Sequence, residues 1–311
     1  MGRRKKGRPI SGWVVLDKDY DFGSTEAVSK VRWLFQAQKA GHAGTLDPLA
    51  TGILPIALGE ATKTVPYVME AEKLYRFTAK WGAATTTDDS EGEIIQRSDE
   101  RPSPDAIEAI LSDYTGEIEQ VPPNFSAIKV KGNRAYDLAR DGQEVTLEAR
   151  TITIHELRLV DIPDADHAVF EARTGKGAYV RALVRDMAIA LGTAGHISAL
   201  RRVAVGPFHE DDAITLAQID AEPAGEARDG LLEGLDLALR DLPATSLDGP
   251  QAMRLTQGQA AIASPAQAKG IRGDRVGEVD AVLATLHGDP VAICCLDGLK
   301  LKPVRVFNTA R

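Results

Sequence analysis

Two segments in which apolar residues recur at helical spacing limit the folds open to this chain more than any other feature. The first begins near Ser24, a good N-cap, and runs to Phe35, and the second begins near Tyr179 and stops at Gly192. Each segment places its apolar residues on one stripe, which predicts a helix packed by one side against another layer. Strand-like runs surround both segments, so the chain is predicted to be a mixed α+β protein.

Short apolar or alternating runs predict the strands. These runs are Gly12–Leu16, Leu74–Trp81, Ile152–Val160, Ala168–Ala172 and Val203–Val205. The glycine-rich stretch Gly41–Gly59 shows no convincing periodicity, and it is interpreted as a structured loop. The sequence Ser103-Pro104-Asp105 combines an N-cap, a first-turn proline and an acid, so it predicts another helix start.

The pattern divides the chain into three parts. Residues 1–9 are predicted to be a basic flexible arm, residues 10–245 the main domain, and residues 246–311 a small β-rich domain. The last part contains the strand-like runs Val291–Leu296 and Lys302–Phe307. One continuous domain is the alternative.

The charge distribution limits the classes of partner. The net charge of −8 argues against a protein that coats nucleic acid without specificity. Local RNA binding stays open, because basic clusters occur at Arg3–Arg8, Lys129–Arg134 and Arg201-Arg202. Any single charged run, such as the acidic Asp88–Glu93, is most simply a solvated face.

The sequence also bears on location and cysteine chemistry. No apolar run approaches the roughly 18 residues of a membrane span, and the basic N-terminus lacks the apolar region of a secretory signal. A cytoplasmic protein without membrane association is therefore expected. The adjacent Cys294 and Cys295 are predicted to be buried strand residues without a metal or redox role.

Common catalytic signatures are missing, including GxSxG, GxxxxGK[ST], GxGxxG and HExxH. What remains is carboxylate chemistry without metal, or a binding protein. Asp47 is the main candidate: glycines flank it, Pro48 stiffens the chain after it, and apolar residues surround it. A rigid, partly apolar frame suits a nucleophile or a general base. The alternative is a turn aspartate that bonds its own backbone.

A second candidate is Arg181, a cation in the first turn of the predicted helix, where the helix dipole disfavours positive charge. Such an arginine usually has an anionic partner, either a carboxylate such as Asp47 or an RNA phosphate, although an exposed arginine without a role is possible. Tyr75, Tyr179 and His42 could be ordinary packing residues. Together they offer the surfaces that an enzyme acting on a flipped base needs.

Several segments resemble one known family. GHAGTLDPLATGILPIALGEATK (Gly41–Lys63) resembles the catalytic motif of the TruB family of tRNA pseudouridine synthases, and KLYRF (Lys73–Phe77) resembles its tyrosine motif. The stretch Gln120–Gly142 is similar to one characteristic of the TruB branch. GKGAYVRALVRDMAIALG (Gly175–Gly192) resembles the arginine motif, and HISALRR (His196–Arg202) the leucine segment.

The resemblance is strong over about residues 10–210 and implies the fold and the roles of three residues. It implies a pseudouridine synthase domain around a central mixed or antiparallel sheet, followed by a PUA-like RNA-binding domain. Asp47 would be the nucleophilic aspartate, Arg181 would pair with it and keep it ionised, and Tyr75 would stack on the target base. The route of Asp47 stays open: attack at C6 of uracil, attack at C1′ of ribose, or assistance to elimination of the base.

The remaining implied contacts concern the RNA. His42 would occupy the space left by the flipped base, and Tyr179 and Leu200 would line the pocket. The implied reaction converts uridine 55 in the T stem-loop of tRNA to pseudouridine, without metal or organic cofactor. It also implies action without guide RNA or an obligate protein partner, and a monomer is expected.

The chain departs from the family pattern in places. The usual Asp-Lys-Pro near the first strand is replaced by Asp17-Lys18-Asp19, which puts the geometry of that loop in question. Thr86 stands where aspartate is common, and Phe125 replaces a frequent tyrosine. The rival hypotheses are a non-enzymatic RNA chaperone, a guide-RNA-dependent subunit, and a carboxylate hydrolase with coincidental motifs.

Overall fold

The computed structural model describes residues 7–126, 129–130, 133–134 and 147–308. Most of the predicted basic arm, and the side chains of the basic cluster Lys129–Arg134, therefore lie outside the described residues. Arg8 pairs in strand fashion with Ala37 and forms an ion pair with Asp229.

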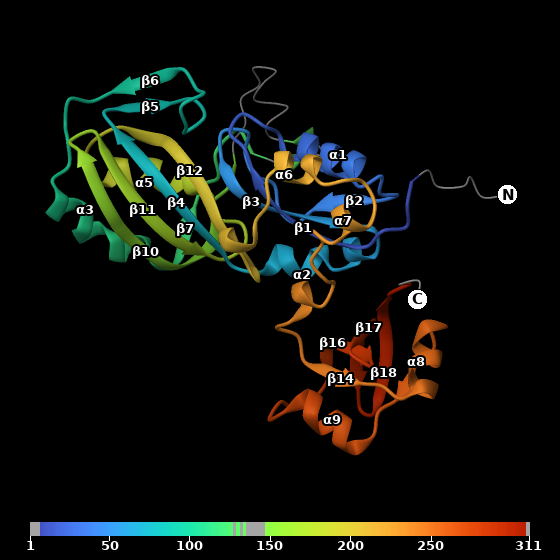
Figure 1. Ribbon diagram of the computed structural model, residues 1–311. Helices are drawn as coiled ribbons and strands as arrows, with labels where there is room; N and C mark the ends of the chain where they lie inside the picture. Colours follow the sequence, from blue (N-terminus) through green and yellow to red (C-terminus); the bar gives the residue numbers. More distant parts are fainter. Residues whose placement is uncertain (1–6, 127–128, 131–132, 135–146, 309–311) are drawn as a thin grey trace.

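A central nine-stranded sheet forms the body of the molecule (Figure 1). Its main path runs through β1 (Gly12–Lys18), β3 (Thr51–Leu58), β12 (Gly195–Val205), β4 (Lys73–Trp81), β11 (His167–Thr174), β10 (Arg150–Asp164) and β7 (Gly116–Gln120). The short strands β2 (Ala40–His42) and β13 (Phe208–His209) pair with β3 and β12. The β3–β12 pair is parallel and the other pairs are antiparallel, so the predicted mixed sheet is confirmed.

Both predicted amphipathic helices are present and lie against this sheet. The helix α1 (Ser24–Leu34) buries Ala27, Val31 and Leu34. The helix α5 (Val180–Ala190) buries four members of its predicted stripe: Val180, Leu183, Val184 and Met187. Gly192 follows α5 with φ of +72°, a left-handed conformation that favours glycine and ends the helix as predicted.

Shorter elements connect the strands. Those before β7 are η1 (Gly59–Lys63), α2 (Val65–Glu70), β5 (Ala83–Thr85), β6 (Ile94–Arg97), α3 (Pro104–Ile110) and η2 (Leu111–Tyr114). Those after it are β8 (Lys129–Val130), β9 (Asn133–Arg134), η3 (Glu210–Asp212), α6 (Leu216–Ala221), α7 (Glu226–Asp229) and η4 (Leu237–Leu239). Ser103 caps α3 by accepting a hydrogen bond from the Ala106 amide, which confirms the predicted start.

Two predictions about the first quarter of the chain are wrong. The stretch Gly41–Gly59 is not one loop, because β3 occupies most of its second half. β3 lies between two strands with nearly all its residues buried, so it is apolar after Thr51 and shows no alternation. Ser24 does not cap α1; the N-cap is Gly23, and the Ser24 hydroxyl bonds to Leu46 instead.

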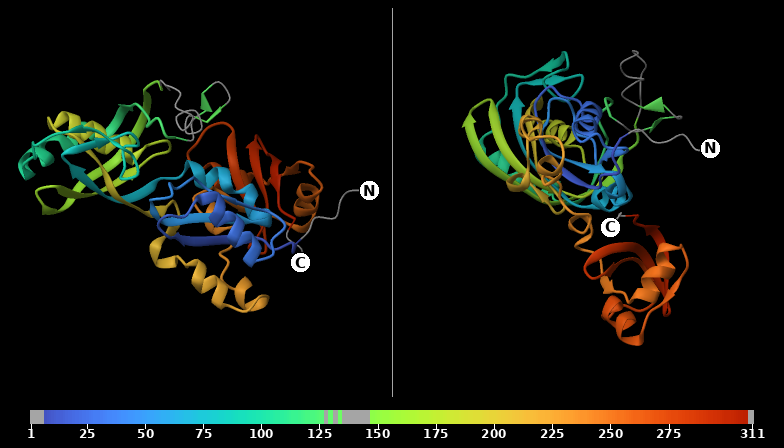
Figure 2. Two further views of the ribbon diagram at one scale, coloured as in Figure 1. Left: turned by 90° about the horizontal axis from the view of Figure 1, so that it is seen from above. Right: turned by 45° about the vertical axis from the view of Figure 1, so that its right-hand side comes forward.

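The C-terminal part forms a separate lobe, as Figures 1 and 2 show. It contains β14 (Ala244–Ser246), α8 (Gly249–Thr256), β15 (Ala261–Ile262), α9 (Pro265–Arg272), β16 (Val279–Leu286), β17 (Asp289–Asp297) and β18 (Lys300–Val306). The strands make a five-stranded sheet, so the predicted β-rich domain is confirmed. Within β17, Cys294 is buried as predicted, whereas Cys295 is only half-buried.

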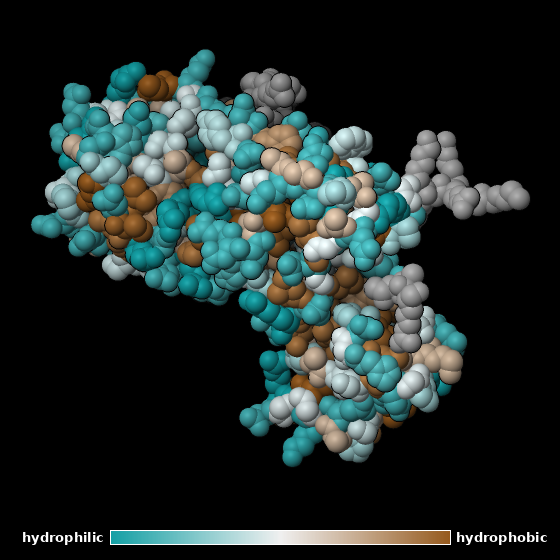
Figure 3. Space-filling view, in the orientation of Figure 1, coloured by the Kyte–Doolittle hydropathy of each residue, from teal (hydrophilic) through white to brown (hydrophobic). Residues whose placement is uncertain are grey.

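The lobe is attached to the body through an apolar contact with polar bonds at its edge. Phe307 belongs to the same buried cluster as Trp13 and Val68 of the body. Apolar surface gathers at the waist between the two parts in Figure 3. Nζ of Lys63 donates to the carbonyl of Val306 over 2.7 Å. None of the helices in the described residues has the length and apolar character of a membrane span.

Candidate active site

Asp47 lies in the loop of residues 43–50, which joins β2 to β3. The Ser24 hydroxyl, at the start of α1, accepts from the Leu46 amide over 2.9 Å and lies 2.7 Å from the Leu46 carbonyl. The Ala50 amide donates to the Asp47 carbonyl, which closes a turn around Pro48. The backbone next to Asp47 is therefore fixed to the body of the protein.

The buried side chain of Lys18 binds a backbone carbonyl that follows Asp47 in this loop. Lys18 is 1% exposed, and its Nζ lies within 3.0 Å of the carbonyl oxygens of Asp19, Phe22 and Pro48. Burial lowers the pKa of Lys18 to about 8, although nearby carboxylates partly oppose this. The departure from the family pattern after Lys18 therefore leaves an ordered connection, which the lysine ties to the loop of Asp47.

The buried side chain of Arg202 binds backbone carbonyls that precede Asp47 in the loop. Arg202 on β12 is 1% exposed and donates to the carbonyls of Gly44, Thr45 and Ile53. Its neighbour Arg201 forms ion pairs with Asp17 and Glu210. Both side chains of this predicted basic cluster are thus occupied within the protein, and the pair does not form a free cationic patch.

The predicted pairing of Arg181 with Asp47 is present. Nε of Arg181 lies 2.9 Å from Oδ2 of Asp47, and because the N–H is not aligned for a hydrogen bond, the contact is an ion pair. The Arg181 side chain is 6% exposed and that of Asp47 is 40% exposed. The arginine is therefore buried behind a carboxylate that remains accessible to a substrate.

Arg181 has further partners that sequence reasoning missed. Its NH1 donates to the Thr87 carbonyl and lies 3.6 Å from Oδ2 of Asp89, and its NH2 donates to the Phe125 carbonyl. Asp89 was grouped with a solvated acidic run, but it is 7% exposed. The burial of Asp89 depends on contacts between α5 and its turn, such as the bond from Arg181 to the Thr87 carbonyl, so no local pattern in the sequence marks it.

These groups surround a small pocket of about 20 Å³, which has room for about one water molecule. Asp47, Asp89, Arg181 and Leu200 are among its lining residues. A nucleobase is larger than this space, so its entry requires side chains such as Leu200 to move. The pocket joins one exposed carboxylate to a buried positive charge, an arrangement suited to nucleophilic or acid–base chemistry.

Three predicted site residues are not in the lining of this pocket. Tyr75 on β4 is half-buried and packs against the apolar cluster that contains Val180, at the start of α5. Tyr179 is the N-cap of α5, and its backbone amide and carbonyl both bond to the side chain of Gln120. His42 on β2 has a buried Nδ1 without a hydrogen-bond partner, and burial, helped by Arg202, lowers the pKa of its ring.

Comparisons with known proteins point to one family. A profile of the TruB family pseudouridylate synthase N-terminal domain matches residues 32–180, and one of the tRNA pseudouridylate synthase B C-terminal domain matches residues 181–241. The tRNA pseudouridine synthase B of Agrobacterium fabrum is 54% identical over 98% of this chain and 97% of its own. The chain belongs to the TruB family. Its members are isomerases that act on tRNA, so the predicted enzyme class is confirmed.

Further relatives of this TruB-family chain support its fold. The tRNA pseudouridine synthase B of Caulobacter vibrioides is 53% identical over 99% of both chains. A solved Cbf5-Nop10-Gar1 complex contains a chain that is 25% identical, with a TM-score of 0.72 over 95% of this chain and 84% of that one. A chain in the structure of an H/ACA RNP bound to a substrate RNA containing 2′-deoxyuridine has a TM-score of 0.73 at 21% identity, over 99% of this chain and 92% of that one.

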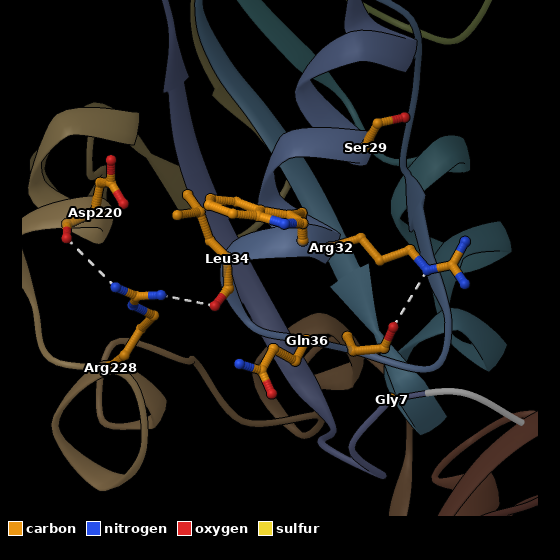
Figure 4. A pocket seen from close by; sticks show the side chains of 9 residues that line it. Gly7, Ser29, Arg32, Leu34, Gln36, Asp220 and Arg228 are labelled. Atoms are coloured by element: carbon orange, nitrogen blue, oxygen red, sulfur yellow. Dashed lines mark hydrogen bonds between the residues drawn. The ribbon is translucent and has the colours of Figure 1, made fainter.

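The pocket at Asp47 is smaller than a second cavity. A groove of about 720 Å³ lies between the end of α1 and the α6–α7 segment, with Trp33, Arg32 and Arg228 among its lining residues (Figure 4). Arg228 donates to the carbonyls of Leu34, Asp220 and Glu222 and so joins these helices. No group of three His, Cys, Asp or Glu side chains in the described residues is arranged to hold a metal ion.

Proposed function

We propose that this enzyme converts uridine 55 in the T loop of tRNA to pseudouridine, with Asp47 as the catalytic nucleophile. The observation that carries the proposal is the exposed Asp47 carboxylate at a pocket, 2.9 Å from the buried Arg181. The Arg181 guanidinium compensates the negative charge of Asp47 from within the protein. The other side of the carboxylate faces the solvent, from which the RNA arrives.

The reaction can use one carboxylate because it is a rearrangement. The bond from N1 of uracil to C1′ of ribose breaks, and a bond from C5 to C1′ forms. The proton on C5 is lost and N1 gains a proton, so no net oxidation or external nucleophile is required. Asp47 is the group that opens the glycosidic linkage in this scheme, and the ion pair with Arg181 holds it in place before the base enters.

The target uridine must leave its stack to reach Asp47, because the reacting atoms are covered in a folded T loop. Tyr75 on β4 packs against the apolar cluster that includes Val180, and its ring would stack on the flipped base. Leu200 lines the pocket beside Asp47, Tyr179 lies at the N-terminal end of α5, and His42 takes the place of the base in the loop. The Asp47-containing pocket has to widen for this to happen.

The proposal extends to domains and partners. Residues 10–245 form the catalytic domain and residues 246–311 a PUA-like domain that binds another part of the tRNA. The enzyme works in the cytoplasm as a monomer without guide RNA, cofactor or an obligate protein partner.

Replacing Asp47 by Asn tests the proposed nucleophile. The amide keeps the shape of the side chain but removes the charge, so pseudouridine formation should fall below detection while the Kd for tRNA changes by no more than about threefold. Asp211→Asn, an exposed aspartate in η3, is the control and should keep full activity. Product formation by the Asp47→Asn protein would contradict the proposal, and a wild-type protein that binds tRNA without making product would favour the chaperone hypothesis.

A further inference from the structure

The turn that supplies Asp89 contains a second buried aspartate. Asp88 is 8% exposed and has φ of +61°, a left-handed conformation that is costly for residues other than glycine, asparagine and aspartate. Its carbonyl accepts from the amide of Ile197, a residue of the pocket wall. The position of Asp88 is therefore tied to the geometry of the active-site pocket.

Arg185 is the partner of Asp88. It follows Arg181 by four residues on α5, so the two side chains lie on the same face one turn apart. NH1 of Arg185 lies 3.1 Å from Oδ2 of Asp88, Nε donates to Asp186, and NH2 donates to the carbonyl of Val121. The aspartates at 88 and 89 thus face the arginines at 185 and 181, in two adjacent pairs.

The two pairs are electrostatically coupled, because an arginine of one pair also acts on a carboxylate of the other. Arg181 already serves two carboxylates, with Asp47 at 2.9 Å and Asp89 at 3.6 Å. Burial raises the pKa of Asp88, and the cations that oppose this are Arg185 and Arg181. If Arg185 were absent, the buried Asp88 carboxylate would attract the guanidinium of Arg181, which is the other cation acting on it.

We propose that Arg185 is a positioning residue for the isomerisation. By neutralising Asp88, it leaves the Arg181 guanidinium directed to Asp47 and holds the turn of residues 85–91 in the conformation that presents Asp89. Arg185 acts through Arg181 and does not touch the substrate. This inference rests on the proposed catalytic role of Asp47, but it does not depend on which uridine is the target.

The test uses single-turnover kinetics with tRNA that carries tritium at uridine C5. Formation of any pseudouridine releases this tritium, so the assay reports the chemistry independently of the position modified. Arg185→Gln should lower the single-turnover rate by about tenfold, equivalent to about 1.4 kcal/mol, with the Kd for tRNA changed by less than about twofold.

The decisive comparison is the double variant Asp88→Asn, Arg185→Gln. Asn tolerates the left-handed backbone at this position and removes the competing charge, so the double variant should recover to within about threefold of the wild-type rate. A purely structural role predicts instead that the rates of both variants follow their melting temperatures, because the double variant also relieves the uncompensated buried charge of Asp88. A rate for the double variant at or below that of Arg185→Gln overturns the proposal.

Arg185→Lys keeps the test valid if the glutamine variant does not fold, which thermal melting would show. The lysine keeps a positive charge beside Asp88, so its rate should stay within about threefold of the wild type. A folded Arg185→Lys protein with a tenfold lower rate overturns the charge-based account. Release of tritium without product at uridine 55 would instead contradict the proposed target and leave the role of Arg185 to be measured on the uridine that is modified.

Discussion

At the scale of single residues, two buried cations fix the loop that carries the Asp47 carboxylate. Lys18 and Arg202 approach this loop from β1 and β12 and take up backbone carbonyls on either side of Asp47. Buried carbonyl oxygens without a donor are costly, so each cation stabilises the loop by satisfying these acceptors. Arg181 can then meet Asp47 at a fixed distance.

Replacing Arg202 by Met should lower the free energy of unfolding by roughly 2–4 kcal/mol, because two loop carbonyls and that of Ile53 on β3 lose their charged donor. The neighbouring Arg201 provides a matched control. Its ion pairs are about a third exposed, so Arg201→Met should cost less than about 1 kcal/mol. Urea unfolding measures both, and equal losses would contradict the proposed clamp.

The low pKa of Lys18 predicts a pH dependence of stability. In the unfolded chain the lysine titrates near its ordinary 10.5, whereas in the folded protein its pKa is about 8. Between these values the unfolded state holds more protons, so the stability of the wild type should rise with pH relative to Lys18→Met. Urea unfolding of both proteins from about pH 7 to pH 10.5 tests this, and a constant difference would contradict it.

The sequence predicted Asp47 and Arg181 because the family resemblance identifies residues that lie in recognisable motifs. It did not predict Asp89, since an acidic residue in a polar turn has no local sign of burial. That burial arises only when α5 packs beside the turn of residues 85–91. Ser24 was misassigned for a similar reason: its hydroxyl has a tertiary partner, Leu46, that competes with the helix cap.

At the scale of elements, the site depends on how closely β3 approaches β12. Gly52 pairs with Arg202 in parallel register and has φ of +98°. A Cβ at Gly52 would lie 2.2 Å from the carbonyl oxygen of Arg202. The sequence did not reveal this strand because Gly52, Pro55 and Gly59 are residue types that are common in loops. In the structure, Gly52 and Gly59 permit close backbone contacts, and the carbonyl of Pro55 accepts a hydrogen bond from the Ala43 amide.

Gly52→Ala should therefore separate β3 from β12 and lower the free energy of unfolding by more than about 2 kcal/mol. The matched control is Gly41→Ala, where a Cβ meets no atom within 4 Å and the stability should change by less than about 1 kcal/mol. Thermal or urea unfolding distinguishes the two. A Gly52→Ala protein as stable as Gly41→Ala would show that the contact between the strands is not tight.

At the scale of the whole molecule, the C-terminal lobe is held in a defined position relative to Asp47. Phe307 is 4% exposed within a cluster that spans both parts, and Glu60 accepts from the amide of Asn308. The strands of this lobe and its separate sheet were predictable from the strand-like runs in the sequence. The contacts that dock the lobe on the body of the protein were not. The docking contacts join residues more than 200 positions apart and have no local pattern.

Loosening this contact should separate the binding of whole tRNA from that of its T arm. Phe307→Ala removes the apolar anchor, so the affinity for full-length tRNA should fall by about tenfold while the affinity for an isolated T-arm hairpin stays within about twofold. Phe307→Leu keeps much of the contact and is the control. An equal loss on both RNAs, or no loss on tRNA, would contradict a fixed C-terminal RNA-binding lobe.

The most direct test of the central claim is to map pseudouridine in a T-arm transcript after incubation with the purified protein alone. Pseudouridine should form at the position equivalent to uridine 55, with no modification at the other uridines and no product from the Asp47→Asn protein. Product that requires an added guide RNA or protein partner, product at another uridine, or no product at all would contradict it.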